Sequence, residues 1–541
     1  MRTGPDRKRS LLPGLAAMAL ASLLAAGLSQ AEARVAPSGA EQRLVDADPE
    51  LYGMAKAYFP GDTEALPPRR IFRLTRDQID RSVAALLPRH TKGSVKAAMP
   101  RDPLQTNYEY AELIGLNAAN WGPLSGWIGE IAARVGKDPT PVADCPGGAS
   151  DTVCLERAAR QFVTRAFRGA ASLDRIDKLA RFFLAGAKAG GIGQAAADLV
   201  EVVLSSPDFL FRKELEIGPT GELVPAQRLE TLAYTLADAP PEALGLDPAK
   251  AASYFAGSPD TLVERIAASP AARAKLQRFF KAWLEIKEPA DFTISRQAFP
   301  EFTQELAAAM VAETDRFLEA GLSGPRPRLK DLTQAAGLAV AKPAEPPPPP
   351  RLGIFSQPAV LASHSGPDGT RLVKRGVFWV RKVMCMEMEP PPPGVDTTQY
   401  AAASTTERAR IEQITAAKAC IGCHKKIDPF GFALENYDAL GRWRTLDNGF
   451  PIDAAVAFDL PDEEPAKTTG PVEALRLLAG SMLLKQCFVR QIFRFYMGRS
   501  EEPGDDPLLR RMLFAFAQKD EQDILKLLRV MAADARMVRR Q

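Results

Sequence analysis

Apolar residues recur every three or four positions along most of this chain, which is the spacing of an amphipathic helix. The alternation of apolar and polar residues that is typical of a half-buried strand is scarce. Thr75 and Gln78 stand at the two positions of a capping box and predict a helix beginning beside them. The clearest helical stretches are residues 160–188, interrupted near Gly169, and residues 261–286, 302–318 and 487–497. We therefore expect a mainly α, multi-domain helical protein, and 541 residues predict three or four domains.

The first 33 residues have the pattern of a secretory signal peptide. A basic start, Arg7 to Arg9, precedes an apolar stretch over residues 11–28, and Ala31-Glu32-Ala33 matches the small-residue cleavage signal. The alternative is an uncleaved membrane anchor, against which Pro13 and the cleavage signal argue. We expect the mature chain to begin at Arg34, to have no transmembrane segment after signal removal, and to be periplasmic or secreted.

Composition narrows the function classes. With 46% hydrophobic and 25% charged residues the chain has the make-up of an ordinary globular protein. A net charge of +3 gives no overall field that would attract nucleic acid, so we expect no nucleic-acid partner. The chain has only three histidines, which nearly excludes a site built from several of them. Two proline runs, residues 346–350 and 390–393, predict stiff polyproline II segments, and the first is expected to be a linker.

Cys420, Cys423 and His424 form the motif C-x-x-C-H, the signature of covalent c-type haem attachment. Two thiols must reach the two vinyl groups on one edge of a porphyrin, and a helical turn places them on one side. The adjacent histidine then offers its imidazole to the iron as the proximal ligand. Because c-type haem is attached after export, the expected location suits this chemistry. We expect one covalently bound haem c.

Three other interpretations of this motif stay open. A thioredoxin-like redox pair would have the same two-residue spacing, although no strand pattern precedes it. A zinc site would need partner ligands that the sequence does not offer nearby. A structural disulfide between Cys420 and Cys423 is the third alternative.

Four cysteines remain if Cys420 and Cys423 bind haem, and four is an even number. They are Cys145, Cys154, Cys385 and Cys487. Of the three possible connectivities, the simplest joins Cys145 to Cys154 and Cys385 to Cys487. The second bond would close a loop of about a hundred residues around the haem motif, worth about 4–5 kcal/mol in the chain-entropy model.

Residues 425–444 carry a specific resemblance to a known family of proteins. With the motif before them, they are similar to the pattern C-x-x-C-H-x-x-I-D-P-x-G-F-A-L-E-N-[FY]-D-x-x-G-x-[WY]-R. The chain resembles secreted, cytochrome-like multi-domain proteins of planctomycete type, assembled from domains of unknown function 1587, 1595, 1592, 1588 and 1585. Two further segments resemble flanking parts of the same proteins: Arg375-Gly376 with Cys385, and Cys487 with Met497-Gly498-Arg499. The family has no established activity, so the resemblance implies haem and export and names no substrate.

The resemblance also implies a domain order. After the signal peptide, 1–33, and an N-terminal linker, 34–68, we expect helical modules at 69–140 (1587-like), 145–218 (1595-like) and 225–345 (1592-like). A haem-attachment module at 351–450 (1588-like) and a C-terminal helical module at 465–541 (1585-like) follow. Two departures weaken the middle of the match: Gly169-Ala170 replaces an Arg and a Pro, and residues 228–234 lack the aromatic opening of the third module.

Charged residues after the motif have two interpretations. Asp428, Glu435 and Asp438 could serve acid–base chemistry, but structural roles are expected: a turn cap for Asp428, and pairing with Arg442 or Arg444 for the other two. The same two arginines are candidates to meet the haem propionates.

The leading functional hypothesis is an exported monohaem protein that transfers electrons to an unknown redox partner protein or small molecule. The alternatives are a haem enzyme of peroxidase or oxygenase type and a secreted binding or scaffold protein. The sixth iron ligand separates carrier from enzyme. Its first candidate is Met497, and the others are Met482, His364, Met384, Met386 and Met388.

Overall fold

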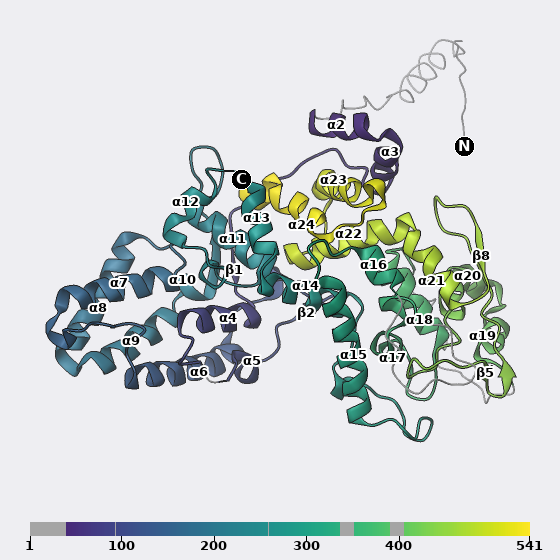
Figure 1. The fold of residues 1–541 in the computed structure, drawn as a ribbon, viewed down its shortest axis with the longest axis horizontal. Coiled ribbons are helices and arrows are strands. Elements are labelled where there is room, and N and C mark those ends of the chain that lie inside the picture. The colour runs from purple at the N-terminus through teal and green to yellow at the C-terminus, as the bar shows by residue number, and fades with distance from the viewer. Residues whose placement is uncertain (1–38, 92, 258, 336–350, 390–404) are drawn as a thin grey trace, which may run out of the picture. The chain divides into compact units, whose positions relative to one another are not determined.

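The computed structural model describes residues 39–91, 93–257, 259–335, 351–389 and 405–541. The signal peptide and both proline runs lie outside these ranges. The described chain is mainly helical, as expected (Figure 1). It divides into two compact units, one ending at Pro49 and one from Glu50 to Gln541. The first contains helix α2 (Gly39–Ala47).

The elements before residue 215 are α3 (Pro49–Tyr58), β1 (Arg70–Arg73), α4 (Arg76–Leu86), α5 (Val95–Ala98), β2 (Leu104–Gln105), β3 (Tyr108–Glu109), α6 (Ala118–Lys137), α7 (Thr152–Ala166), α8 (Leu173–Gly190), α9 (Ile192–Leu204), α10 (Pro207–Leu210) and β4 (Phe211–Glu214). Those from 225 to 335 are α11 (Pro225–Ala237), α12 (Ala251–Tyr254), α13 (Pro259–Ala267), α14 (Pro270–Trp283), α15 (Gln304–Leu322) and α16 (Leu329–Gln334).

The elements after residue 350 are α17 (Pro358–Ser363), α18 (Leu372–Phe378), the π-helical turn η7 (Trp379–Val383), α19 (Glu407–Thr415), α20 (Lys418–Phe432), β5 (Leu446–Asp447), β6 (Phe450–Pro451), β7 (Val456–Phe458) and β8 (Ala466–Thr468). The chain ends in α21 (Pro471–Gly480), α22 (Met482–Met497), α23 (Asp506–Ala517), α24 (Ile524–Ala533) and α25 (Ala535–Val538). None of the helices in the described ranges is long and apolar enough to cross a membrane.

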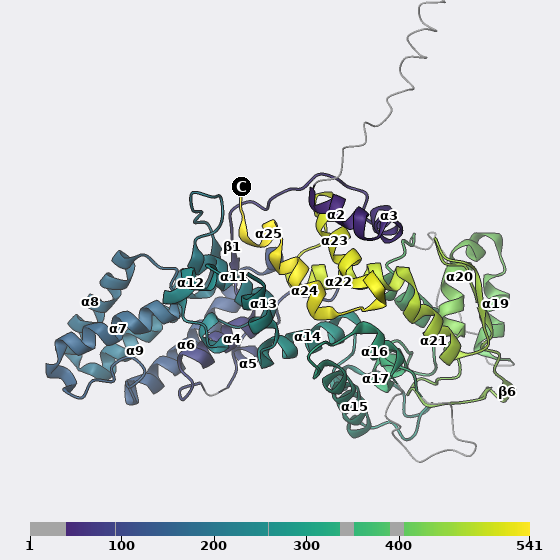
Figure 2. The same cartoon turned by 45° about the horizontal axis from the view of Figure 1, so that its top comes forward.

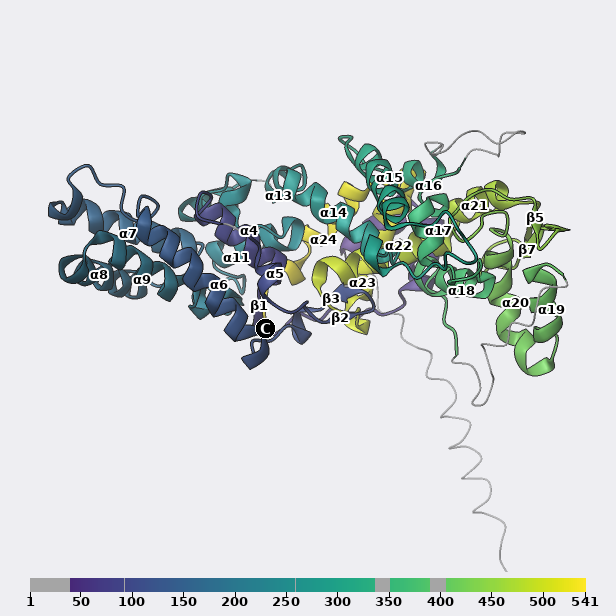
Figure 3. The same cartoon turned by 90° about the horizontal axis from the view of Figure 1, so that it is seen from below.

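Helices α6, α7, α8 and α9 pack side by side around one apolar core (Figure 1, Figure 3). The expected interruption near Gly169 separates α7 from α8, where Arg168 and Gly169 both have positive φ and Ser172 caps the next helix. A disulfide between Cys145 and Cys154 ties the preceding loop to α7 and confirms the first predicted pairing.

The helical character expected over residues 261–286 is confirmed, but the stretch is divided into two helices. Helix α13 ends at Ala267, and α14 begins at Pro270 with the Ser269 side chain accepting a hydrogen bond from the Ala272 N–H. A capping serine followed by proline is a local helix-start signal, since proline has no N–H to leave unpaired at the first turn. The capping box at Thr75 and Gln78, by contrast, is present with both of its hydrogen bonds at the start of α4.

The few strands in the described ranges form two-stranded antiparallel pairs. The pair β1–β4 sets Arg70 opposite Glu214 and so joins segments far apart in the sequence. Helix α24 packs against α13 (Figure 2). Between these parts, α14 and α22 share an aromatic core in which the Trp283 ring lies 5.2 Å from Phe488 and 5.9 Å from Phe279.

Candidate haem-binding site

Helix α20 carries the C-x-x-C-H motif. Cys420 and Cys423 lie three residues apart and His424 four residues after Cys420, so all three share one face of the helix. Neither thiol is in a disulfide, and both are partly exposed. Ile421, between the two cysteines in the sequence, is 48% exposed, whereas Ile427, three residues after His424 on the same face as the motif, is buried. The motif is therefore partly exposed where it begins on α20, whereas the continuation of the same face is buried.

His424 is oriented by a carboxylate one turn further along the helix. Its Nδ1 lies 2.9 Å from Oδ1 of Asp428, whose side chain is buried. With the proton on Nδ1, the imidazole donates to Asp428 and keeps the Nε2 lone pair for a metal. Asp428 thus supports the histidine, and the expected role of this residue as a turn cap is replaced by that contact.

Two glycines let α20 lie directly against α18. A Cβ at Gly376 would collide with the Ile427 carbonyl oxygen, and a Cβ at Gly431 would collide with that of Leu372. Both obstacles are backbone atoms, which do not move aside as a flexible side chain does. The close packing of the two helices holds the motif at a defined place on the domain.

Arg375 fixes the chain where it leaves α20. The side chain is fully buried and donates to the carbonyl oxygens of Leu434, Tyr437 and Asp438, at 3.2, 2.6 and 2.6 Å. It also donates to the Ser365 hydroxyl at 3.0 Å. Burial, with the nearby Arg444 charge, lowers the pKa of Arg375 to about 10, so it remains a cation at neutral pH. One buried guanidinium therefore holds the G-F-A-L-E-N-Y-D turn in place.

The two candidate propionate partners are already engaged. Arg442 donates to Oδ2 of Asp438 through Nε at 2.7 Å and also pairs with Glu301. Arg444 donates from Nη1 to Asp447 at 2.5 Å and from Nη2 to the Thr370 hydroxyl at 2.9 Å. The expected pairing of Asp438 with an arginine is found, and these contacts tie the turn together.

Glu435 is a buried carboxyl without the expected arginine partner. Its side chain is 0% exposed, and neither carboxyl oxygen has a hydrogen-bond partner among the described residues. Arg444 instead donates to the Glu435 backbone carbonyl at 3.1 Å. Burial and the nearby Asp447 and Glu407 carboxylates raise the pKa of Glu435 to about 7, although Arg444 opposes them. The native protein thus holds a proton at Glu435 that the unfolded chain releases at lower pH.

This proton makes stability depend on pH. Because the folded pKa lies above the unfolded value of 4.5, its stabilising effect is complete below pH 4.5 and is lost as the pH rises towards 7. A shift of this size amounts to about 3 kcal/mol. Glu435→Gln should therefore raise the free energy of unfolding by up to about 3 kcal/mol at pH 8 and by much less at pH 4.5. Urea denaturation at both pH values checks this, with exposed Glu464→Gln as control, and an equal effect at both would contradict it.

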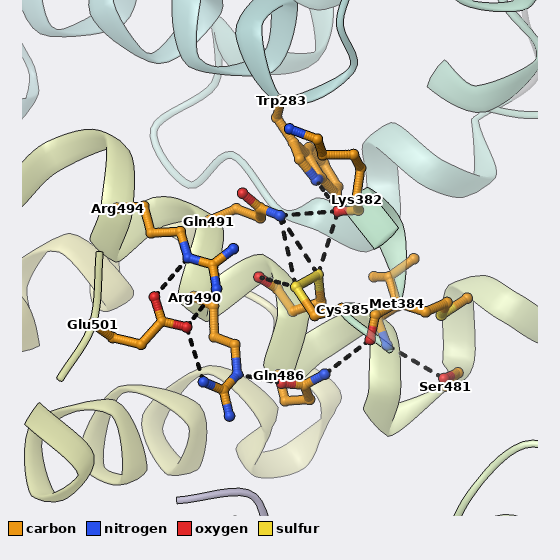
Figure 4. The surroundings of a disulfide bond; sticks show 12 residues. Trp283, Lys382, Met384, Cys385, Ser481, Gln486, Arg490, Gln491, Arg494 and Glu501 are labelled. Atoms are coloured by element: carbon orange, nitrogen blue, oxygen red, sulfur yellow. Dashed lines mark hydrogen bonds and ion pairs between the residues drawn. A yellow bond between two sulfur atoms is a disulfide. The ribbon is translucent and has the colours of Figure 1, made fainter. Parts of the chain in front are cut away.

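The second predicted disulfide, Cys385–Cys487, is confirmed and lies where three segments meet (Figure 4). The Lys382 carbonyl oxygen accepts from Trp283 Nε1 at 2.7 Å and from Gln491 Nε2 at 3.2 Å. These contacts join α14 and α22 to the turn η7, which itself packs against α20. The bond therefore anchors the motif-bearing region to the C-terminal helices.

The candidate sixth ligands lie in different places. Met497 ends α22 and lines a cavity to which α20 contributes no residue. His364 is fully buried with Nε2 2.9 Å from the Leu284 carbonyl oxygen, and burial lowers its pKa to about 3. Met384 is also fully buried, whereas Met386, Met388 and Met482 are partly exposed. The assignment of Met497 as sixth ligand stays a prediction.

Three family models match the chain. They are a protein of unknown function DUF1595 over residues 154–214, DUF1592 over 225–342 and DUF1588 over 351–447. The chain therefore belongs to the planctomycete-type multi-domain family that is built from these domains. The DUF1588 match contains α18, α19 and α20 and hence the whole C-x-x-C-H motif. No curated protein and no solved structure matches the chain.

The residues present fit a covalently attached haem. The fit rests on the donor set. Two thiols lie outside any disulfide, and one imidazole has its Nδ1 engaged and its Nε2 unengaged among the described residues; all three side chains share one partly exposed helix face. The sequence reasoning missed the support of His424 by Asp428, although the four-residue spacing on a helix is a signal that could have shown it. It also missed the cavity beside Met497, whose walls come from distant segments.

Proposed function

We propose that this protein is an exported c-type monohaem protein that transfers electrons, with Cys420 and Cys423 as thioether links and His424 as proximal ligand. The observation that carries the proposal is the helix face on which two unpaired, partly exposed thiols precede a histidine already oriented by Asp428. When bound, the haem would supply a one-electron iron couple.

The other interpretations of the motif find less support. The thiols of Cys420 and Cys423 are free, whereas the other four cysteines are paired. A thioredoxin-like pair opens a helix after a strand, but α20 follows helix α19. Two disulfides elsewhere support export, because such bonds persist in oxidising compartments.

The test is the absorption spectrum of the full-length protein from a host with haem-maturation machinery, in the oxidised and reduced states. Electron transfer predicts one haem that resists acid-acetone extraction, is low-spin when ferric and cycles reversibly. A high-spin ferric spectrum that shifts with cyanide or peroxide would favour a haem enzyme instead. A folded, colourless protein would reject haem function and leave the binding or scaffold role.

Substitution of Asp428 tests the proposal through the midpoint potential of the haem iron. A carboxylate that accepts from Nδ1 makes the imidazole a stronger electron donor, which stabilises the ferric over the ferrous state. Asp428→Asn should therefore raise the midpoint potential of the haem iron. A tenfold change in how strongly the ligand set favours the ferric over the ferrous state equals about 59 mV for one electron. Spectroelectrochemical titration measures the shift. Asp453→Asn, at an exposed carboxylate, is the control, and a potential unchanged or lowered in Asp428→Asn would contradict the role.

A further inference from the structure

A cavity of about 270 Å³ lies where β1, β3, α4, α11, α14 and the end of α22 meet. The volume equals that of about nine water molecules in the liquid, enough for a ligand of about a dozen non-hydrogen atoms. Its polar wall includes Asp77, Glu109, Asp238, Lys275, Arg278 and Tyr496. These residues come from the chain before the DUF1595 match, from the DUF1592 match and from the C-terminal helices. The cavity lies outside the DUF1588 match that carries the haem motif.

The charges in this wall neutralise one another. Asp238 accepts from Lys275 Nζ at 2.9 Å and also pairs with Arg278, which reaches Asp77 as well. Gln78 Nε2 donates to the same carboxylate of Asp238 at 2.8 Å. The two cations hold the pKa of Asp238 at about 2 against the effect of burial, so the carboxylate is ionised at neutral pH. Arg73 and Arg212 also line the cavity, and they pair with Asp102 and Glu214. Each of these cations therefore already has a carboxylate partner.

Several polar groups of the wall are left without a hydrogen-bond partner among the described residues, among them the Nε–H groups of Arg73 and Arg212. The Tyr496 side chain is 4% exposed, and its hydroxyl has no hydrogen bond. Arg278 has an unpaired Nε–H beside its ion pairs. The Glu109 carboxyl makes no hydrogen bond or ion pair within the described ranges, and burial with the nearby Asp102 carboxylate raises its pKa to about 7. Near pH 7 this carboxyl both donates and accepts hydrogen bonds.

The rest of the wall is aromatic and apolar. The Phe495 ring lies 5.6 Å from that of Tyr108 and 5.4 Å from that of Tyr496, and Met497 and Phe72 also line the cavity. Such a surface covers the carbon–hydrogen faces of a ligand, while the unpaired groups bind its polar edge.

We propose that this cavity binds a small uncharged molecule with several hydroxyl groups, of the size of one sugar unit. A hydroxyl group both donates and accepts, so neighbouring hydroxyls can satisfy the Tyr496 hydroxyl, the Arg278 Nε–H and the Glu109 carboxyl together. Because the cations of the wall already have carboxylate partners, a charged ligand of either sign would bring a charge without a counter-ion, whereas an uncharged ligand would not. The proposal goes beyond the haem function and does not rest on it.

The experiment measures binding to the full-length protein by saturation-transfer NMR and calorimetry. The probes are D-glucose, D-galactose and myo-inositol, with D-gluconate and D-glucosamine as charged counterparts. At least one neutral probe should bind, at least tenfold more tightly than either charged one. Binding of a charged probe alone, or of no probe, would overturn the proposal.

Variants locate the binding. Tyr496→Phe removes one oxygen from the wall, and Glu109→Gln keeps the shape but removes the acid, so each should weaken binding about tenfold. Tyr437→Phe is the matched control, since that buried hydroxyl also lacks a partner but lies outside the cavity. Glu112→Gln, at an exposed neighbour of Glu109, is the second control. Equal affinity in the cavity variants and the controls would place any binding elsewhere and reject the site.

Discussion

Replacing both Cys420 and Cys423 with alanine is expected to abolish covalent haem attachment completely. The two thiols lie on one face of α20 and are the only described cysteines outside a disulfide, so no other described pair can take over the thioether links. Each single variant should keep at most one link. Haem staining of the protein after denaturing electrophoresis measures the loss directly.

The double variant should remain folded, because the helix face that carries the thiols is partly open and their removal leaves no buried void. Circular dichroism checks this, and Ile421→Ala at the exposed position between them is the control that should keep its haem. Covalent haem retained in the double variant would reject the proposed site. A wild-type protein without haem would reject the proposed function and leave the cavity proposal standing.

Removing the Cys385–Cys487 disulfide is expected to destabilise the protein by about 4–5 kcal/mol. These cysteines are 102 residues apart, and in the chain-entropy model a loop of that length confers this much by restricting the unfolded chain. The cost is large against the 5–15 kcal/mol by which domains are usually stable. The double variant to alanine should therefore unfold at a clearly lower urea concentration.

The other disulfide supplies the matched control. Cys145 and Cys154 are 9 residues apart, and the same model gives about 3 kcal/mol for so short a loop. The long-loop variant should lose more stability than the short-loop variant in parallel urea titrations. Equal losses, or a larger loss in the short-loop variant, would show that strain and packing outweigh chain entropy at these two bonds.

The sequence alone determined the features that depend on residues a few positions apart. The shared face of Cys420, Cys423 and His424 follows from spacings of three and four on a helix, and the Thr75–Gln78 capping box depends on a spacing of three. Composition and periodicity determined the mainly helical class, and an even cysteine count narrowed the pairing. The break at Ser269-Pro270 and the support of His424 by Asp428 also depend on residues a few positions apart. Both could therefore have been predicted from the sequence, but they were not.

Tertiary structure decided the features that depend on burial. Glu435 looks like any carboxylate in the sequence, and it holds its proton only because the fold removes it from water beside Asp447. From the sequence, Arg442 and Arg444 could both have contacted the haem propionates. In the fold, Arg442 pairs with Asp438 and Glu301, and Arg444 pairs with Asp447.

The cavity was beyond sequence reasoning for the same reason. Glu109, Asp238, Lys275 and Tyr496 are spread over almost four hundred residues, and no local pattern relates them. Met497, whose nearness along the chain to Cys487 made it the first candidate for an iron ligand, also lines that cavity at the end of α22. Spacing along one helix is set by the backbone itself, whereas the neighbours of a side chain across the fold are set by which apolar faces pack together.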